Sequence, residues 1–376
     1  MIKQNLAAFF RMLRYRFKPY KVKERELDGE GVTSLCAQVS ESYQKLGLVN
    51  SFSLYRSVVD SLISDPKLDF KPLSDLMGPV QEGRVTVALR HDLDADIVTG
   101  LRAARFLASR GVPGSFYLLH TSHYYGMFDK GFFYRYSSLA TFVDGFIATG
   151  CEIGLHADPL HIYYNHECNG IQAVSKELEW LRSCGVKIKG TVAHNSAAAF
   201  GAENFEVFRG MSVGGRTKLR YKNSSIPLGF VDENILGLCY EGNYPVLPDH
   251  IDSNEADEFI RLCKGDAVRN KEWLELYFLR NPFFDRSYDV DVWLLAKDAW
   301  AIAKRGEDRV LRWPVTTDDM LLAMGQLEEG VRVVVNIHPE YVSGKGGEQC
   351  LILKKEKEMM KTRGQKITRV SIMDTQ

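Results

Sequence analysis

A dense group of ionisable residues stands in the segment VALRHDLDAD, residues 87–96. Asp92 and Asp94 are two residues apart, so their side chains point the same way if an extended strand runs through both. Burying several carboxylates beside an imidazole is costly unless a partner balances the charge, and a divalent metal ion is such a partner. The pattern predicts a metal site in which one aspartate binds the ion and the other acts as a base on water. A helix N-terminus, which also favours carboxylates, is the alternative.

A second group of imidazoles and carboxylates lies in GLHADPLH, residues 154–161. His156, Asp158 and His161 follow an apolar run at short spacing, and their side chains are common ligands of zinc. Together with the aspartates upstream, they form a candidate half of the same metal site. His156 is expected to bind the ion, while His161 and Asp158 compete for a second position.

Further residues are candidates for catalysis or substrate binding. His338, in VNIHPEYV, has the ordinary histidine pKa near neutrality that suits a proton donor to a leaving group, and a histidine at the core edge is the alternative. His194, in GTVAHNS, is expected to be an oxyanion donor or a substrate contact. Arg90 and His91 crowd the two aspartates and join the candidates. The aromatic segment after His120, TSHYYGMF, is expected either to line a sugar-like substrate or simply to pack.

The candidate residues share one position in the chain, just past the end of an apolar run. Each run is typical of a buried parallel strand. Segments with apolar residues at helical spacing separate the runs, for example Ile97–Ser109 and Ile171–Ser183. Because strands and helices alternate, we predict an α/β fold with a parallel sheet or barrel whose polar mouth lies at one face. The runs are Val85–Leu89, Ser115–Leu119, Cys151–Leu155, Val186–Val192 and Val331–Ile337.

The same patterns divide the chain into three parts. Residues 1–84 are predicted to form a helical N-terminal extension and residues 85–343 the β/α domain. Residues 344–376, rich in Lys and Glu, are predicted to form a C-terminal helix and tail. Within the central part, residues 290–303 are predicted to be helical. The predicted chemistry is confined to the central part.

Composition and charge exclude several classes of protein. With 376 residues, 45% hydrophobic and 26% charged, the chain has an ordinary globular composition. Lys plus Arg and Asp plus Glu both number 48, so no overall field favours nucleic acid, and we expect no nucleic-acid partner. The seven cysteines are scattered and contain no CxxC pair, which indicates reduced thiols and a cytoplasmic location.

The sequence also bears on membrane association. No segment approaches the roughly 20 consecutive apolar residues of a transmembrane helix, so we predict no transmembrane segment. The first 25 residues are basic and amphipathic, with an apolar run too short for a signal peptide. This N-terminus is expected either to make peripheral membrane contact or to form a solvated helix docked on the main domain.

At these residues the sequence resembles the polysaccharide deacetylase superfamily (carbohydrate esterase family four), in its divergent bacterial branch with an LRHDVD-type first motif. The similarity runs through VALRHDLDAD, GVPGSFYLL, YYGMFD, GCEIGLHAD, GTVAHNS and NIHPEYV, in that order within residues 50–345. It implies a distorted barrel of the (β/α)7 type and a divalent metal, usually zinc. It also implies hydrolysis of an acetyl group on a sugar or glycan, in surface-polysaccharide biosynthesis.

The resemblance implies roles for individual residues. Asp92 matches the catalytic base, Asp94 the metal-binding aspartate, and His338 the general acid of the last motif. In the third motif, the usual Arg-Pro of the family is replaced by Ala193-His194. Two other functions stay open beside deacetylation. One is a catalytically inactive, glycan-binding barrel, and the other is a metal hydrolase acting on another C–N or ester bond.

The second motif, GCEIGLHAD and the residues after it, contains the histidine ligands that the resemblance implies. His156 matches its first histidine, and in the family a second histidine follows four residues later. Here that position is Leu160, and His161 lies one residue further on. We therefore predict Asp94, His156 and His161 as ligands, with Asp158 as the competing third ligand.

Overall fold

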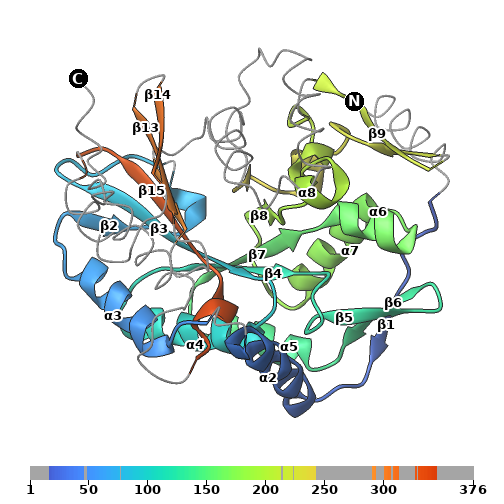
Figure 1. Cartoon of the computed structure of the whole chain (residues 1–376), viewed down its shortest axis with the longest axis horizontal. Helices are drawn as coiled ribbons and strands as arrows, with labels where there is room; N and C mark the ends of the chain where they lie inside the picture. The colour runs from blue at the N-terminus through green and yellow to red at the C-terminus, as the bar shows by residue number, and fades with distance from the viewer. Residues whose placement is uncertain are drawn as a thin grey trace.

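The structure is a computed structural model of the 376-residue chain (Figure 1). It describes residues 17–45, 49–76, 78–212, 215–222, 224–242, 290–293, 300–305, 308–312, 327 and 329–344. All candidate site residues lie within these ranges. The first 16 residues and the predicted C-terminal helix and tail beyond residue 344 lie outside the described residues.

A parallel β-sheet, curled into a half-barrel, forms the centre of the molecule (Figure 1). In spatial order its strands are β11 (Tyr240–Glu241), β8 (Gly190–Ala193), β7 (Glu152–Ala157), β4 (Ser115–Leu119), β3 (Val85–Leu93) and β15 (Arg332–Ile337). Every neighbouring pair in this series is parallel. Another strand, β2 (Leu68–Phe70), pairs parallel with the start of β3. The predicted α/β fold with a parallel sheet is confirmed.

Strands also continue the sheet beyond β15, where the sequence pattern predicts a helix. β12 (Val290–Trp293) pairs parallel with β15, and β13 (Trp300–Arg305) and β14 (Asp308–Arg312) follow in antiparallel order. The prediction of a helix over residues 290–303 is therefore wrong. A short apolar run suits a strand as well as a helix, and the sequence VDVW has the period-two alternation of a strand.

Helices precede or connect the strands of the half-barrel. They are α2 (Gly29–Lys45), α3 (Phe52–Ile63), α4 (Ile97–Ser109), α5 (Leu139–Ile147), α6 (Pro159–His166) and α7 (Gly170–Ser183). At the start of α4 the Asp96 carboxylate accepts hydrogen bonds from the Thr99 backbone N–H at 2.9 Å and the Thr99 hydroxyl at 2.6 Å. Asp96 is thus a helix cap. Of the three aspartates in HDLDAD, only Asp96 caps this helix, so Asp92 and Asp94 remain candidates for the metal site.

The N-terminal extension, predicted to be helical, also contains strands. β1 (Val22–Arg25) pairs parallel with β6 (Phe132–Tyr136), which forms an antiparallel hairpin with β5 (Gly126–Asp129). β2 lies in the extension as well and belongs to the main sheet. These short strands are ordered by partners far along the chain, which a local pattern does not show. The remaining short elements are η1 (Leu73–Asp75), α8 (Ala197–Phe200), η2 (Asn204–Val207), β9 (Lys218–Tyr221), β10 (Ser224–Pro227), α9 (Glu233–Leu236) and η6 (Pro339–Val342).

The aromatic segment after β4 packs into the core and does not line an open surface. His120, Tyr124 and Tyr125 are fully buried. The Tyr124 hydroxyl donates a hydrogen bond to the carbonyl of Leu93 at 2.7 Å, and the Tyr125 hydroxyl donates one to the Glu177 carboxylate at 2.9 Å. Of the two interpretations offered by the sequence, the structure favours packing.

The two faces of β3 meet different surroundings. All nine of its residues are buried, and successive side chains point to opposite faces. On the inner face of the curled sheet, Ala88 packs with Tyr117 of β4, Val192 of β8 and Val334 of β15. Gly154 of β7 leaves room for this layer, because a Cβ there would lie 2.6 Å from the Tyr117 ring. Further along the strand, the inner positions become polar.

His91 lies on the outer face of β3, between the sheet and α3. Its ring stacks on Phe116 with the ring centroids 4.3 Å apart, and its Nε2 is 3.0 Å from the Tyr55 hydroxyl. Burial lowers the pKa of His91 to about 4. The structure therefore places this candidate residue in the core, away from the sheet mouth.

No helix among the described residues is long and apolar enough to cross a membrane. Their cysteines, which are Cys36, Cys151, Cys168, Cys184 and Cys239, are free thiols.

We expect the buried His91 to make the protein less stable in mild acid. The unfolded chain binds a proton there near pH 6.5 and the folded protein near pH 4, so stability falls as the pH decreases through that interval. The double variant His91→Phe with Tyr55→Phe removes both hydrogen-bond partners and the titration. From pH 7 to pH 5, urea unfolding should show the wild-type protein losing about 2 kcal/mol more than the double variant. Equal losses would contradict this expectation.

Candidate metal centre

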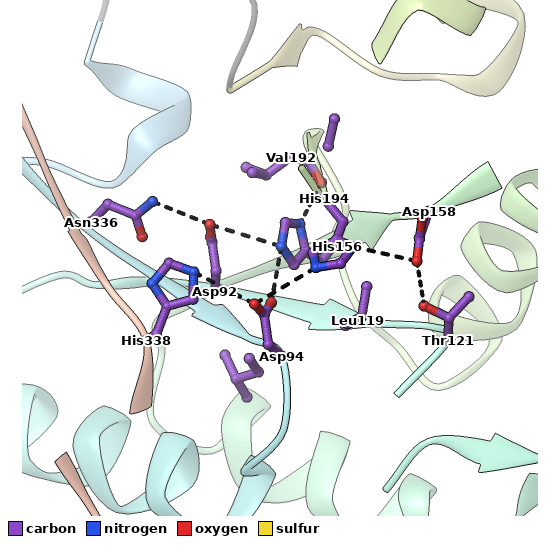
Figure 2. A network of polar contacts seen from close by, with 12 residues as sticks. Asp92, Asp94, Leu119, Thr121, His156, Asp158, Val192, His194, Asn336 and His338 are labelled. Carbon is purple, nitrogen blue, oxygen red and sulfur yellow. Dashed lines mark hydrogen bonds and ion pairs between the residues drawn. The ribbon is translucent and has the colours of Figure 1, made fainter. Parts of the chain in front are cut away.

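The carboxyl ends of four strands bring five predicted residues together at the mouth of the half-barrel (Figure 2). β3 carries Asp92, with Asp94 just beyond its end, β7 carries His156, His194 follows β8, and His338 follows β15. Because parallel strands end at the same edge of a sheet, residues far apart in sequence converge there. The strand ends predicted from the sequence thus meet at one place.

Asp94, His156 and His194 are placed to hold one metal ion. Each offers one ligand atom, and these atoms all lie within 4.8 Å of one another. His156 Nε2 is 3.1 Å from Asp94 Oδ1, and His194 Nε2 is 3.8 Å from Asp94 Oδ2. No other group of histidine, cysteine and acidic side chains in the described part of the chain has this arrangement. One carboxylate with two imidazoles is a known zinc ligand set.

His161, predicted as the third ligand, does not join this group. α6 begins at Pro159, so the chain turns into a helix directly after Asp158 and carries His161 away from the strand end. There its Nδ1 is 3.9 Å from Asp158 Oδ2 and 3.1 Å from Asn165 Nδ2. The structure therefore places His194, and not His161, in the third position.

Asp158, the competing candidate, lies behind His194 rather than beside the other ligands. Its Oδ2 is 3.4 Å from His194 Nδ1 and accepts a hydrogen bond from the Thr121 hydroxyl at 2.7 Å. Its Oδ1 accepts one from Asn204 Nδ2 at 2.8 Å. Burial disfavours its charge, but the neighbouring His194 holds the pKa of Asp158 well below its usual range. Both oxygens of Asp158 are thus engaged by protein donors.

The surroundings of the His156 ring bear on whether this group of residues fits a metal ion. His156 Nδ1 lies 2.8 Å from the carbonyl oxygen of Val192. A carbonyl only accepts, so Nδ1 carries the hydrogen on that side of the ring. Nε2 is directed at Oδ1 of Asp94, a buried oxygen 3.1 Å away without a hydrogen-bond partner among the described residues. Because Nδ1 is already held by the carbonyl, Nε2 and this carboxylate oxygen are the atoms that could bind one cation, so the residues fit a metal ion.

His194 supports the same conclusion through its charge. Burial opposes its protonation, but the carboxylates of Asp158 and Asp94 raise the pKa of His194 to about 9. In the metal-free protein the ring is therefore an imidazolium at neutral pH. The two carboxylates attract a positive charge that a divalent ion would supply in its place, and His194 would then be a neutral ligand.

Asp92 is held as a carboxylate on the inner face of β3. Arg90 donates to both of its oxygens, through Nε to Oδ1 at 2.8 Å and through Nη2 to Oδ2, and Asn336 Nδ2 is 3.3 Å from Oδ2. Burial favours the neutral acid, but the charge of Arg90 outweighs it and lowers the pKa of Asp92. Asp92 Oδ2 is 3.9 Å from His156 Nε2. A carboxylate able to accept a proton therefore stands beside the metal-ligand group.

His338 lies near the same group, on the strand at the other side of β3. Its Nε2 is 3.6 Å from Asp94 Oδ2, and its ring packs edge-on against Tyr341. Burial lowers the pKa of His338, although the charges of Asp94 and Asp92 act in the opposite direction. A protonated ring with a lowered pKa is a stronger acid than a free imidazolium, which suits a proton donor.

Three further residues of this network are not predicted from the sequence. Asn336 precedes His338 by two residues on β15, so strand alternation would have placed both on the inner face. Thr121 reaches Asp158 from the turn after β4, and Asn204 reaches it from the start of η2. No local pattern marks these two, because their contacts depend on the tertiary fold.

Comparison of the chain with models of protein families, with curated proteins and with solved structures returned no match. The site itself therefore carries any functional assignment. It offers a group of metal-ligand atoms, one carboxylate kept ready to accept a proton and one imidazole able to give one. These are the parts needed for metal-assisted hydrolysis.

We expect the protein to bind one zinc or cobalt ion through the three residues named above. Asp94→Ala, His156→Ala and His194→Ala should each weaken binding by about 100-fold or more, because each removes a ligand. His161→Ala is the matched control and should bind as the wild type does. Elemental analysis after dialysis measures the bound metal. Titration with cobalt, followed by its visible absorption, measures the affinity of each variant. Loss of the metal in His161→Ala with retention in His194→Ala would refute the placement of His194.

We expect replacement of Arg90 by methionine to destabilise the protein, since Asp92 would keep a buried charge without its guanidinium. Breaking such a pair costs about 3–5 kcal/mol, measured as the fall in the free energy of unfolding in urea at pH 7. At about pH 4 the loss should shrink, because without Arg90 the carboxylate takes up a proton more easily. The double variant Arg90→Met with Asp92→Asn, which carries no unpaired charge, should recover most of the loss. A loss under about 1 kcal/mol in the single variant would argue against this role.

Proposed function

We propose that this protein is a metal-dependent deacetylase that hydrolyses an acetyl group from a sugar or glycan conjugate. The observation that carries the proposal is the position of Asp92 and His338 beside the group formed by Asp94, His156 and His194. The proposal includes the distorted (β/α) barrel of polysaccharide deacetylases, a zinc ion, and an acetylated sugar as substrate. It also includes a cytoplasmic location and a place in surface-polysaccharide biosynthesis.

The motifs that resemble polysaccharide deacetylases support this proposal through where they lie. VALRHDLDAD, GCEIGLHAD, GTVAHNS and NIHPEYV are far apart in the sequence, yet their polar residues reach one mouth of the sheet (Figure 2). The curled parallel half-barrel supports the barrel of the family as the fold. The resemblance and the geometry agree on Asp94 and His156. They differ on the third ligand, for which the resemblance implies His161 and the geometry His194.

The proposed reaction divides the work between the ion and the protein. A bound zinc ion supplies a Lewis acid for the acyl carbonyl and lowers the pKa of the attacking water. Asp92 accepts a proton from that water on the oxygen that faces His156. Arg90 and Asn336 keep this carboxylate ionised and oriented before the substrate arrives. His338 Nε2 then gives a proton to the departing amine or alkoxide.

The exposure of the side chains indicates the side from which a substrate approaches. The side chains of Asp94 and His194 are 27% and 32% exposed, whereas those of Asp92 and His156 are only 2% and 3% exposed. A sugar at the mouth of the half-barrel therefore meets Asp94 and His194 first. The acyl carbonyl of the substrate must then lie deeper in the mouth than Asp94 and His194, so that the attacking water contacts Asp92.

We expect zinc- or cobalt-loaded protein to release acetate from N-acetylated or O-acetylated sugars. Asp92→Asn should lower kcat by about 10²- to 10⁴-fold, because the variant lacks the base, while the zinc content per chain stays that of the wild type. His338→Ala should lower kcat with the metal retained. Acetate release together with elemental analysis tests both variants. His161→Ala, whose ring lies outside the proposed machinery, is the control and should keep full activity.

Two results would overturn the deacetylase assignment and point to an alternative. Loaded protein that is inactive on acetylated sugars but cleaves formyl or other amide substrates would be a hydrolase for another C–N or ester bond. Protein that hydrolyses none of these substrates but binds glycans equally well with and without a chelator would be a glycan-binding barrel. A panel of acetylated, formylated and amide substrates, with calorimetry of glycan binding, separates the three.

A further inference from the structure

We propose that Asp158 is a positioning residue of the metal centre. It accepts the Nδ1 hydrogen of His194 and so holds that ring with Nε2 directed at the metal position. The proposal rests on His194 as third ligand in the proposed function. It does not depend on the substrate.

His194 lies between two carboxylates, one at each nitrogen (Figure 2). Its Nδ1 is 3.4 Å from Asp158 Oδ2, and its Nε2 is 3.8 Å from Asp94 Oδ2. A neutral imidazole carries one hydrogen, and the nitrogen without it is the ligand. A carboxylate behind Nδ1 stabilises the hydrogen there, so Nε2 is left to bind. Asp158 thereby selects which nitrogen faces the metal position.

Asp158 is itself fixed by several hydrogen bonds. It is 1% exposed. The Thr121 hydroxyl donates to Oδ2 at 2.7 Å, Asn204 Nδ2 donates to Oδ1 at 2.8 Å, and the backbone N–H of Asp158 donates to His120 Nε2 at 2.8 Å. A carboxylate held at both oxygens and at its backbone cannot turn toward the metal position without breaking these bonds. The arrangement therefore suits an orienting residue better than a ligand.

Asn204 extends the support from the side chain of His194 to its backbone. This fully buried residue donates through Nδ2 to Asp158 Oδ1 and also to the carbonyl oxygen of His194 at 2.7 Å. Its Oδ1 accepts the backbone N–H of Leu160, at the start of α6, at 2.8 Å. One amide group thus joins the loop carrying His194 to the loop carrying Asp158. This link holds the backbone of His194 close to the carboxylate of Asp158.

The backbone that carries His194 is anchored at His194 itself and at the residue before it. The backbone N–H of His194 donates to the carbonyl of Ala157 at 2.9 Å, next to Asp158. Ala193 N–H donates to the Glu241 carboxylate. Such backbone support is needed because His194 stands beyond the end of β8, outside the strand ladder. With the backbone fixed in this way, the side chain of His194 can still rotate, and the contact with Asp158 restricts that rotation.

The two proposed histidine ligands are oriented by acceptors of different charge. His156 Nδ1 faces the neutral carbonyl of Val192, whereas His194 Nδ1 faces a carboxylate. A carboxylate partner makes an imidazole a stronger electron donor to a metal than a carbonyl does. Asp158 should therefore affect metal affinity without binding the metal.

Metal titration of Asp158→Asn tests this role, because the substitution keeps the size of the side chain and removes its charge. We expect the Kd for cobalt or zinc to rise by about 10- to 100-fold. The visible spectrum of the cobalt-saturated variant should keep the shape of the wild-type spectrum, since the ligands are unchanged. His161→Ala is the matched control. It removes the other imidazole near Asp158 Oδ2, 3.9 Å away, and should leave Kd unchanged.

Two outcomes of the titration would overturn the proposal. A changed cobalt spectrum at saturation would mean that Asp158 is itself a ligand. A lowered melting temperature of the metal-free variant with an unchanged Kd would mean that Asp158 only stabilises the fold. Neither measurement uses a substrate, so a failed deacetylase assay leaves this test intact.

A measurement on the wild-type chain decides the question if Asp158→Asn does not fold. In zinc-loaded protein with ¹⁵N-labelled histidine, NMR reports which ring nitrogen of His194 carries the hydrogen. A protonated Nδ1 with zinc on Nε2 supports the proposal. A protonated Nε2, or zinc on Nδ1, overturns it.

Discussion

Burial of negative charge at the mouth of the half-barrel is the constraint on which the rest of the site depends. Asp92, Asp94 and Asp158 stand where the strands end, and each carboxylate requires a positive or hydrogen-donating partner there. Arg90 provides it for Asp92, and His194 for Asp158. Asp94 is shared among the imidazoles of His156, His194 and His338. A divalent ion bound by Asp94 would add positive charge at this edge of the sheet.

Strand alternation separates these charges from the core over very short distances. Arg90 and Asp92 point to the inner face of β3, and His91 between them points outward, where it contacts Tyr55 of α3. Three consecutive ionisable residues thus serve two purposes. Two belong to the site and one to the packing of a helix on the sheet. In the sequence they form one cluster, and only the period of two in an extended strand divides it.

Local patterns predict the strands of the half-barrel because a buried parallel strand is a continuous apolar run. The run Ser115–Leu119 coincides with β4, and Val331–Ile337 exceeds β15 by one residue. The pairing of β1 with β6 and that of β12 with β15 escaped prediction, because the partners are distant in the sequence. The third residue of the candidate metal-ligand group escaped prediction because its position depends on the tertiary fold. The choice between His161 and His194 depends on where α6 begins and on which strand lies beside β7.

The neighbour of β7 also explains why His194, rather than a residue of α6, lies beside His156. His156 pairs with Val192 in the ladder of β7 and β8, so the residue two positions further along the chain, just past the end of β8, reaches the same mouth. His194 occupies that position. The segment HADPLH is free to start a helix at Pro159 directly after the strand. At the same place the carboxylate of Asp158 faces His194 Nδ1, so in the proposed metal centre these two side chains would act together.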